Sequence, residues 1–206
     1  MKSIKYCVFI ICSFLLIIAC PPTNEQKIND YVNTAQKAEE NGFFNDAIEY
    51  NDAIVGIQTK ITLKILAWGQ TDDIDEMKSI LIDVQQEIKT GLNTAKQLSF
   101  NGDSKSKLKN GAIKLLEFYD KVFNNEYEKL MLLVEQLTND AESLTEEEYI
   151  SIALEMGKII DQVSVDENIL DTEFAKLQEQ FARDNGFVLS DESHPLQDML
   201  DEEINY

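Results

Sequence analysis

Residues 145–186 read TEEEYISIALEMGKIIDQVSVDENILDTEFAKLQEQFARDNG and contain the start, the apolar face and the end of one long helix. Thr145-Glu146-Glu147-Glu148 is a capping box, in which the threonine and the last glutamate each satisfy a backbone N–H of the other. Asn185-Gly186 is a typical stop, because glycine readily takes the left-handed conformation at a helix end. The apolar residues between these signals recur every three or four positions: Tyr149, Ile152, Met156, Ile159, Val163, Leu170, Phe174, Leu177 and Phe181.

Three more apolar stripes of this kind precede this segment, at residues 43–68, 74–98 and 108–137. No proline occurs between Thr23 and Gly186, so the strongest helix breaker is missing from this part of the sequence. Turn signals separate the stripes: Gly69 is expected to end the first, Asp72 or Asp73 to cap the second, and Asn101-Gly102 to break the chain before the third, which begins near Ser104.

The gaps between the four stripes are only a few residues long, so each helix has to fold back on its predecessor. We therefore predict an all-α protein, an up-down-up-down antiparallel four-helix bundle. Residues 24–40, with Ile28, Val32 and Ala35 on one face, form either an extra N-terminal helix or an extension of the first helix through Asn41-Gly42. The sustained spacing also suits a coiled-coil homodimer, so monomer and homodimer both stay open.

The N-terminal segment is predicted to be an export signal. Lys2 and Lys5 precede the apolar run Tyr6 to Ile18, which is shorter than the roughly 20 residues that a membrane-spanning helix needs. The run ends in Ala19-Cys20, which resembles the lipobox of bacterial lipoproteins. The resemblance implies that residues 1–19 are a signal peptide cleaved between Ala19 and Cys20, and that Cys20 carries diacylglycerol.

Two readings compete with the lipobox: an ordinary secretory signal in which Cys20 is incidental, and an uncleaved helix. Both fit less well, because Pro21-Pro22 stops any helix directly after the cysteine. The two or three acyl chains of a lipoprotein hold a protein on a membrane durably, whereas one chain does not. We therefore expect residues 20–26 to be a lipidated tether, residues 27–186 the helical bundle, and residues 187–206 an acidic tail that can form a short docking helix.

The chain is strongly acidic, with 38 Asp and Glu residues against 18 Lys and Arg residues and a net charge of −20. Removal of Lys2 and Lys5 with the signal peptide makes the remaining chain more acidic still. Anionic lipid headgroups and nucleic acid phosphates repel such a body. We therefore expect it to stand away from the bilayer on its tether, with no nucleic acid as partner.

No catalytic, metal or cofactor motif is found. Cys7 and Cys12 lie in the predicted signal peptide and Cys20 is assigned to the lipid, so no thiol is left for a disulfide, a metal or a nucleophile. His194, the single histidine, belongs to no Glu-x-x-His motif, which argues against a di-iron bundle. We expect no enzyme, no metal and no cofactor.

Three residues are candidates for binding a small ligand. Asp166 falls where the stripe of residues 145–186 expects an apolar residue, Asn51 borders the first stripe, and Tyr119 belongs to an aromatic group on the third. For each residue, a purely structural role competes with ligand binding. Asp166 can face water at a helix restart, because Ser164-Val165-Asp166-Glu167 is itself a capping pattern; Asn51 can border the core, and Tyr119 can simply pack inside it.

Two stretches, residues 49–58 (EYNDAIVGIQ) and 115–120 (LLEFYD) with Tyr127 beyond, resemble small helical surface lipoproteins described from leptospiral and related genomes. The resemblance implies a surface or outer-membrane location and no particular activity. Pro21 stands where an aspartate would retain a lipoprotein at the inner membrane in enterobacterial-type sorting, which also favours the outer membrane. The function expected from the sequence is a lipid-anchored, non-catalytic module that binds an envelope or host protein; the alternative is a carrier or sensor for a small apolar ligand held between the helices.

Overall fold

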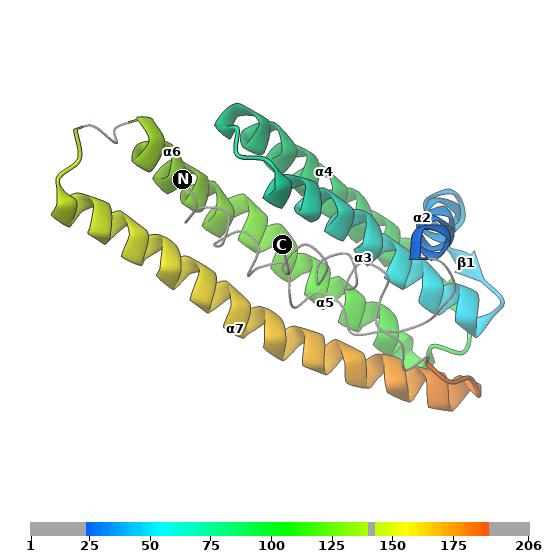
Figure 1. Ribbon diagram of the computed structural model, residues 1–206. Helices are drawn as coiled ribbons and strands as arrows, with labels where there is room; N and C mark the ends of the chain where they lie inside the picture. The colour runs from blue at the N-terminus through cyan, green and yellow to red at the C-terminus, as the bar shows by residue number, and fades with distance from the viewer. Residues whose placement is uncertain (1–23, 140–142, 190–206) are drawn as a thin grey trace.

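The computed structural model describes residues 24–139 and 143–189, and these residues are helical almost throughout (Figure 1). The α-helices are α2 (Asn24–Glu40), α3 (Ala47–Gln70), α4 (Ile74–Gln97), α5 (Lys107–Lys121), α6 (Tyr127–Asn139) and α7 (Glu146–Asn185). A 3₁₀ turn, η1 (Ser104–Ser106), precedes α5, and a π-helical segment, η2 (Val122–Glu126), joins α5 to α6. The two-residue strands β1 (Phe43–Phe44) and β2 (Ser99–Phe100) pair in parallel. The all-α class is confirmed. Ala19 and Cys20 lie outside the described residues, as does the tail from residue 190 onward.

The helix ends follow the capping signals of the sequence. The Asp73 carboxylate caps α4 by accepting the backbone N–H of Glu76 at 2.9 Å. Thr145 and Glu148 form the predicted capping box at the start of α7, and Gly186 ends α7 with a φ of 76°. This left-handed conformation is strained for a residue with a Cβ, so glycine suits the position.

The first stripe was predicted too long at its N-terminal end. Phe43 lies in β1 and is exposed rather than part of the core. The helix begins at Ala47, because the Asp46 side chain accepts the backbone N–H groups of Ile48 and Glu49. At the other end, α3 continues one residue past Gly69 and ends at Gln70.

Residues 24–40 form a helix of their own, α2. The break at Asn41-Gly42 separates α2 from α3, and α2 packs across α3 (Figure 1). The crossing is close at Gly56, where an added Cβ would lie 2.1 Å from the carbonyl oxygen of Tyr31. A glycine in α3 therefore allows the two backbones to meet.

Helices α5 and α6 continue one another through η2. The wider turn keeps Phe123 and Tyr127 on the core side, where their ring centroids lie 4.6 Å apart. Trp68 near the end of α3 contacts both rings, at 6.2 and 5.3 Å. The side chain of Gln85 on α4 donates to the carbonyl oxygen of Phe123 at 2.9 Å, so one backbone group of the irregular turn has a partner.

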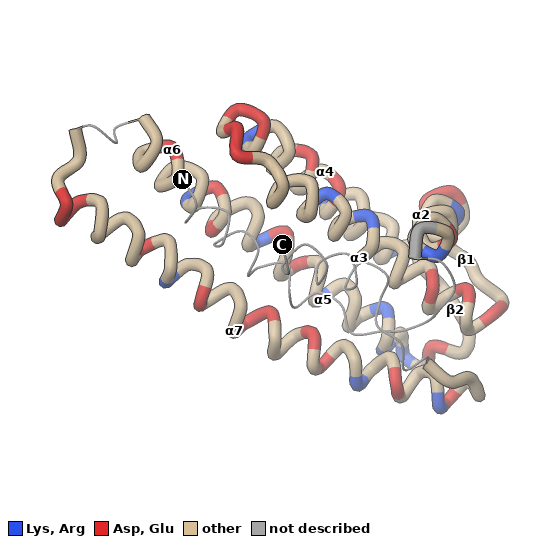
Figure 2. The backbone as a smooth tube through the Cα atoms, in the orientation of Figure 1, with Lys and Arg blue, Asp and Glu red and all other residues tan. Residues whose placement is uncertain are grey.

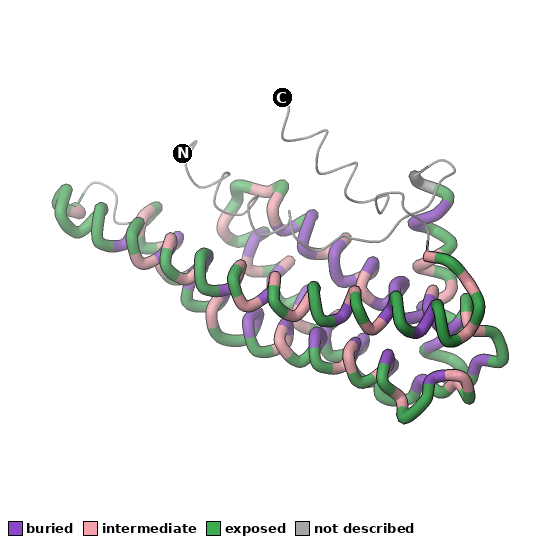
Figure 3. The backbone as a smooth tube through the Cα atoms, turned by 90° about the horizontal axis from the view of Figure 1, so that it is seen from below, coloured by how far each residue is buried: buried purple, intermediate pink, exposed green. Residues whose placement is uncertain are grey.

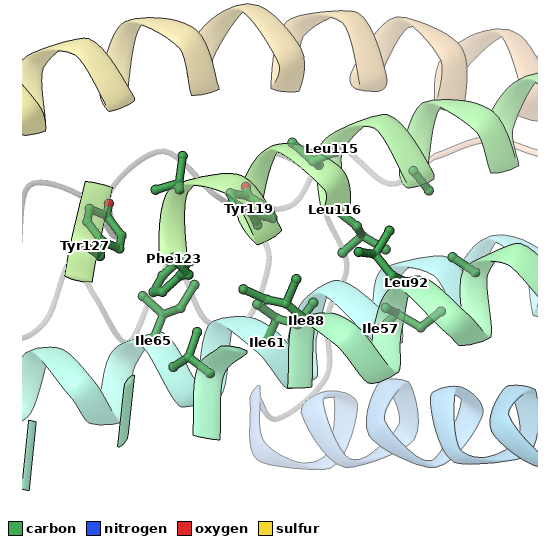
Figure 4. Packing of buried hydrophobic residues seen from close by; sticks show 14 of the residues in the cluster. Ile57, Ile61, Ile65, Ile88, Leu92, Leu115, Leu116, Tyr119, Phe123 and Tyr127 are labelled. Atoms are coloured by element: carbon green, nitrogen blue, oxygen red, sulfur yellow. The ribbon is translucent and has the colours of Figure 1, made fainter. Parts of the chain in front are cut away.

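Each long helix packs on the helix that follows it: α3 on α4, α4 on α5, and both α5 and α6 on α7. In the core, Ile61, Ile65 and Ile88 point toward the side chains of α5 and η2 (Figure 4). At the opposite end from Trp68, Tyr50 contacts the rings of Phe44, Phe100 and Phe181. Helix α7 lies at the outer edge of the assembly (Figure 1). None of the described helices is long and apolar enough to cross a membrane.

Candidate functional site

The face of α7 that points into the protein carries polar side chains among its apolar ones. Glu167 is 2% exposed and Gln178 is 0% exposed, and the half-buried Asp171 lies one turn from Glu167. Buried polar groups require hydrogen-bond partners. The partners of these three side chains therefore show which residues hold α7 in place, and a missing partner marks a place where a ligand can bind.

Glu167 is paired with the predicted candidate Tyr119. The Tyr119 hydroxyl donates to Glu167 Oε1 at 3.0 Å, and both side chains are buried. Burial and the neighbouring Asp171 raise the pKa of Glu167 from 4.5 to about 8, although the hydrogen bond from Tyr119 opposes this shift. Burial also raises the pKa of Tyr119 well above its usual value. At neutral pH Glu167 is therefore mainly protonated, and Tyr119 keeps its proton.

Asp171 completes this cluster. Burial raises the pKa of its carboxyl group from 3.8 to about 7. Its Oδ2 atom is buried and finds no hydrogen-bond partner within the described part of the chain. Glu167 and Asp171 can therefore take up and release protons near neutral pH, which exposed carboxylates cannot do.

Asp166, the acid singled out from the sequence, is only half-buried. Helix α7 runs through residues 164–167 without restarting, so the capping pattern there is not used. The inward face runs through Ile160, Val163 and Glu167, whereas the sequence interpretation followed Ile159. The missed signal was the spacing: Glu167 lies four residues after Val163 and seven before Phe174, as the apolar face requires.

Asn51 is buried on α3 and meets the same face of α7 closer to its C-terminal end. Gln178 Nε2 donates to Asn51 Oδ1 at 3.2 Å, and Asn51 Nδ2 donates to the carboxylate of Asp52 at 3.5 Å. Burial raises the pKa of Asp52 from 3.8 to about 6, against the opposing effect of the Asn51 hydrogen bond. Gln178 Oε1 is buried without a hydrogen-bond partner among the described residues.

The Asn51 and Tyr119 contacts are distinct places in the structure. Their partners on α7, Gln178 and Glu167, are separated by roughly 16 Å at 1.5 Å of helix rise per residue. The three candidates therefore do not converge on one point. Asn51 and Tyr119 each join a different helix to α7, while Asp166 lies beside the Tyr119 contact.

A second buried polar pair, Tyr50 and Asp103, holds the loop between β2 and α5 in place. The Tyr50 hydroxyl donates to Asp103 Oδ2 at 2.9 Å, and the Asp103 carboxylate also accepts the backbone N–H groups of Leu108 and Lys109, each at 3.1 Å. Burial and the Asp103 carboxylate raise the pKa of Tyr50. This pair anchors the start of α5 to α3. Both oxygens of the Asp103 carboxylate already accept hydrogen bonds from the protein.

A surface groove of about 500 Å³ lies between η2–α6 and α7. Six of its eight lining residues are charged or polar: it is lined by Glu126, Lys129, Ser151, Leu154, Glu155, Lys158, Ile159 and Gln162. Lys129 and Glu155 pair across it at 2.6 Å. None of the predicted ligand-binding residues lines this groove.

The outward face of α7 carries four large aliphatic side chains that are exposed. Ile150, Leu154, Val165 and Ile169 are 50%, 60%, 56% and 54% exposed. At 100° per residue they lie on the side of α7 opposite the buried residues. Acidic positions outnumber basic ones along this helix (Figure 2), yet four aliphatic side chains occupy the part of it that faces water.

The comparisons with known proteins give no relative. No protein family, no characterised protein and no solved structure matches the chain. In the described part of the chain, no group of three or more His, Cys, Asp or Glu side chains is arranged to hold a metal ion.

Proposed function

We propose that this protein is a lipid-anchored, non-catalytic helical module of the bacterial envelope, which binds another macromolecule through the outward face of α7. The observation that carries the proposal is the row of four half-exposed aliphatic side chains on that face. Exposed apolar residues gathered on one element mark interaction sites more often than those scattered singly. The up-down-up-down bundle is part of the proposal and is supported by the packing of each long helix on the next.

The anchor is proposed from the lipobox resemblance of Ala19-Cys20, and the outer membrane is the proposed location. Replacing Cys20 by Ser in the full-length chain is expected to abolish lipid labelling and to release the protein from the membrane fraction. Cys12→Ser is the matched control, because it removes a thiol from the predicted signal peptide without touching the lipidated position. Membrane association of the Cys20→Ser protein would contradict the anchor.

The contact surface is tested by photo-crosslinking on intact cells. A photoreactive amino acid at Val165 is expected to give a covalent adduct. The same group at Leu132 on α6 is the control, because Leu132 is at least as exposed, at 65% against 56% for Val165, but lies off the α7 face. Equal labelling at both positions, or none at Val165, would remove α7 as the binding surface.

The carrier alternative receives less support from the geometry. It calls for an enclosed apolar space between the helices, whereas the groove beside α7 lies open at the surface and six of its eight lining residues are charged or polar. The buried contacts of Asn51 and Tyr119 are each occupied by a side chain of α7. Native mass spectrometry of the protein purified from membranes tests this alternative, since a carrier would show a reproducible extra mass.

A further inference from the structure

The exposed aliphatic residues of α7 are arranged symmetrically along the helix. Ile150 and Leu154 are four residues apart, and Val165 and Ile169 repeat that spacing at the other end of the stretch. The centre of the arrangement lies between Ile159 and Ile160. An antiparallel copy of the same helix would therefore present its own aliphatic residues at matching positions.

In such a pair, a twofold axis passes through the centre of residues 150–169. Ile150 of one protomer lies beside Ile169 of the second copy, and Leu154 lies beside the second copy's Val165. Each of these two contacts occurs twice, once on either side of the axis, as a twofold interface requires. Helix α7 lies at the outer edge of the fold, and its exposed side runs along the length of the molecule (Figures 1 and 3).

The charges at the centre follow the same symmetry. Lys158 and Asp161 are exposed and flank the centre of the stretch at equal distance. The antiparallel arrangement places Lys158 beside the second copy's Asp161 on both sides of the axis. A parallel arrangement would set lysine against lysine and aspartate against aspartate, so the charges favour the antiparallel one.

These two groups also leave the face electrically balanced. Lys158 and Asp161 are the central charges between the two aliphatic pairs, and they cancel. Helix α7 as a whole is acidic, with 11 Asp and Glu residues against three Lys and Arg residues. The pairing of Lys158 with Asp161 therefore lowers the repulsion between two copies at the centre of the stretch, where their helices meet.

Gly157 provides a separate observation. Glycine weakens a helix interior, and nothing lies within 4 Å of the place where a Cβ would stand. Packing within the chain therefore does not call for glycine here, in contrast to Gly56. Gly157 lies at the edge of the outward face, three residues after Leu154, where a residue without a side chain leaves room for a helix that approaches from outside.

We propose that the outward face of α7 binds a second copy of this chain. The two helices run antiparallel, and the twofold axis lies level with residues 159 and 160 along the helix. This inference rests on the proposed use of α7 as the contact surface and names its partner. A contact made by one helix of each copy is expected to be small, and small interfaces are typical of weak or transient complexes. Lipid anchoring of both copies in one membrane raises their effective concentration and favours the pair.

Cysteine crosslinking tests the antiparallel geometry in membranes of cells that express the full-length chain. Cells producing Leu154→Cys together with Val165→Cys are expected to form a disulfide-linked dimer. Either variant alone is expected to form far less, because each cysteine faces a non-cysteine residue of the second copy. Leu132→Cys combined with Val165→Cys is the matched control and is expected to stay monomeric.

A crosslink in each single variant would overturn the antiparallel arrangement. No crosslink in the mixed cells would overturn the dimer itself. The photo-crosslink at Val165 separates this failure from failure of the proposed function. An adduct with the mass of two chains supports the dimer; an adduct of another mass overturns it but leaves α7 as a binding surface.

A charge exchange provides an independent readout. Lys158→Asp places aspartate against the second copy's Asp161 and is expected to raise the dissociation constant about tenfold, measured by sedimentation of the detergent-solubilised full chain. Adding Asp161→Lys restores the pairing with the charges exchanged and should return the constant to near its original value. A double variant as weak as the single one would count against the pairing.

Discussion

The Tyr119 hydroxyl on α5 donates a hydrogen bond of 3.0 Å to the carboxyl group of Glu167 on α7, in a place where both side chains are buried. The contact joins two helices that pack against each other, through two residues that are 48 positions apart in the sequence. It puts a carboxylic acid inside the protein in its neutral form, which makes the stability of the fold sensitive to pH.

Stability is expected to fall as the pH rises from about 5 to 8. The pKa of Glu167 is about 8 in the folded protein and near 4.5 when unfolded, so the folded state holds the extra proton within this window. Stability due to this proton is complete below pH 4.5 and is lost as the pH rises through 8. Asp171, with a folded pKa of about 7, acts in the same direction.

Glu167→Gln is expected to flatten this pH dependence, because the amide resembles the protonated acid. Urea unfolding between pH 5 and 9 measures the effect, and the variant should exceed the original protein in stability at pH 9. Glu147→Gln, an exposed acid on the same helix, should keep the original slope. An unchanged slope in Glu167→Gln would show that Glu167 is not buried as a neutral acid.

The Asn51–Gln178 hydrogen bond is expected to show strong coupling between its two residues. Asn51→Leu alone leaves the Gln178 amide buried without its partner and should cost about 1 to 3 kcal/mol. Adding Gln178→Met removes the stranded amide and should recover much of this loss. A double-mutant cycle by urea unfolding measures the coupling, and simple additivity would contradict the contact.

Gly56→Ala is expected to detach α2 from α3. The added methyl group would lie 2.1 Å from the Tyr31 carbonyl oxygen, a distance that only a shift of the backbone can relieve. Proteolysis within residues 24–40 should become faster while the rest of the protein stays folded. Gly157→Ala is the control, since its methyl group meets open space; in dilute protein it should stabilise α7 by up to about 1 kcal/mol.

Gly186→Ala is expected to destabilise the protein by about 1 kcal/mol. The residue has a φ of 76°, where a Cβ approaches the backbone too closely. Gly186→Asn should lose less, because asparagine tolerates this conformation better. Thermal unfolding of both variants measures the difference, and an equal effect would mean that the backbone strain is not the cause.

Local signals in the sequence were sufficient for most helix ends. Asp73, Thr145 and Gly186 act at the ends where they were expected. These features depend on side chains that bond to backbone groups within a few residues, so no tertiary contact is needed to predict them. The start of α3 was predicted too early, because Phe43 continues the apolar spacing although its backbone is extended.

Local signals in the sequence could not predict how α7 is rotated about its own axis, and therefore which of its residues face the core. Ile159 and Ile160 are both apolar, and the spacing alone allowed either to face the core. The choice places either Asp166 or Glu167 inside. It is decided by packing against α5, where Tyr119 offers a hydroxyl group to an acid at the position of Glu167. The π-helical turn at η2 and the β1–β2 pair likewise arise from packing between segments far apart in the sequence.

The sequence by itself determined that this chain is helical, where most of its helices begin and end, and that residues 24–40 can form a helix, because these properties follow from spacing and capping within single segments. Only the tertiary structure decided that α2 is separate, that Glu167 is the buried acid and that four aliphatic residues of α7 remain in water. Whether a side chain is buried depends on which helices its segment packs against. Burial stabilises the fold when the side chain is apolar and costs free energy when it is polar and has no partner.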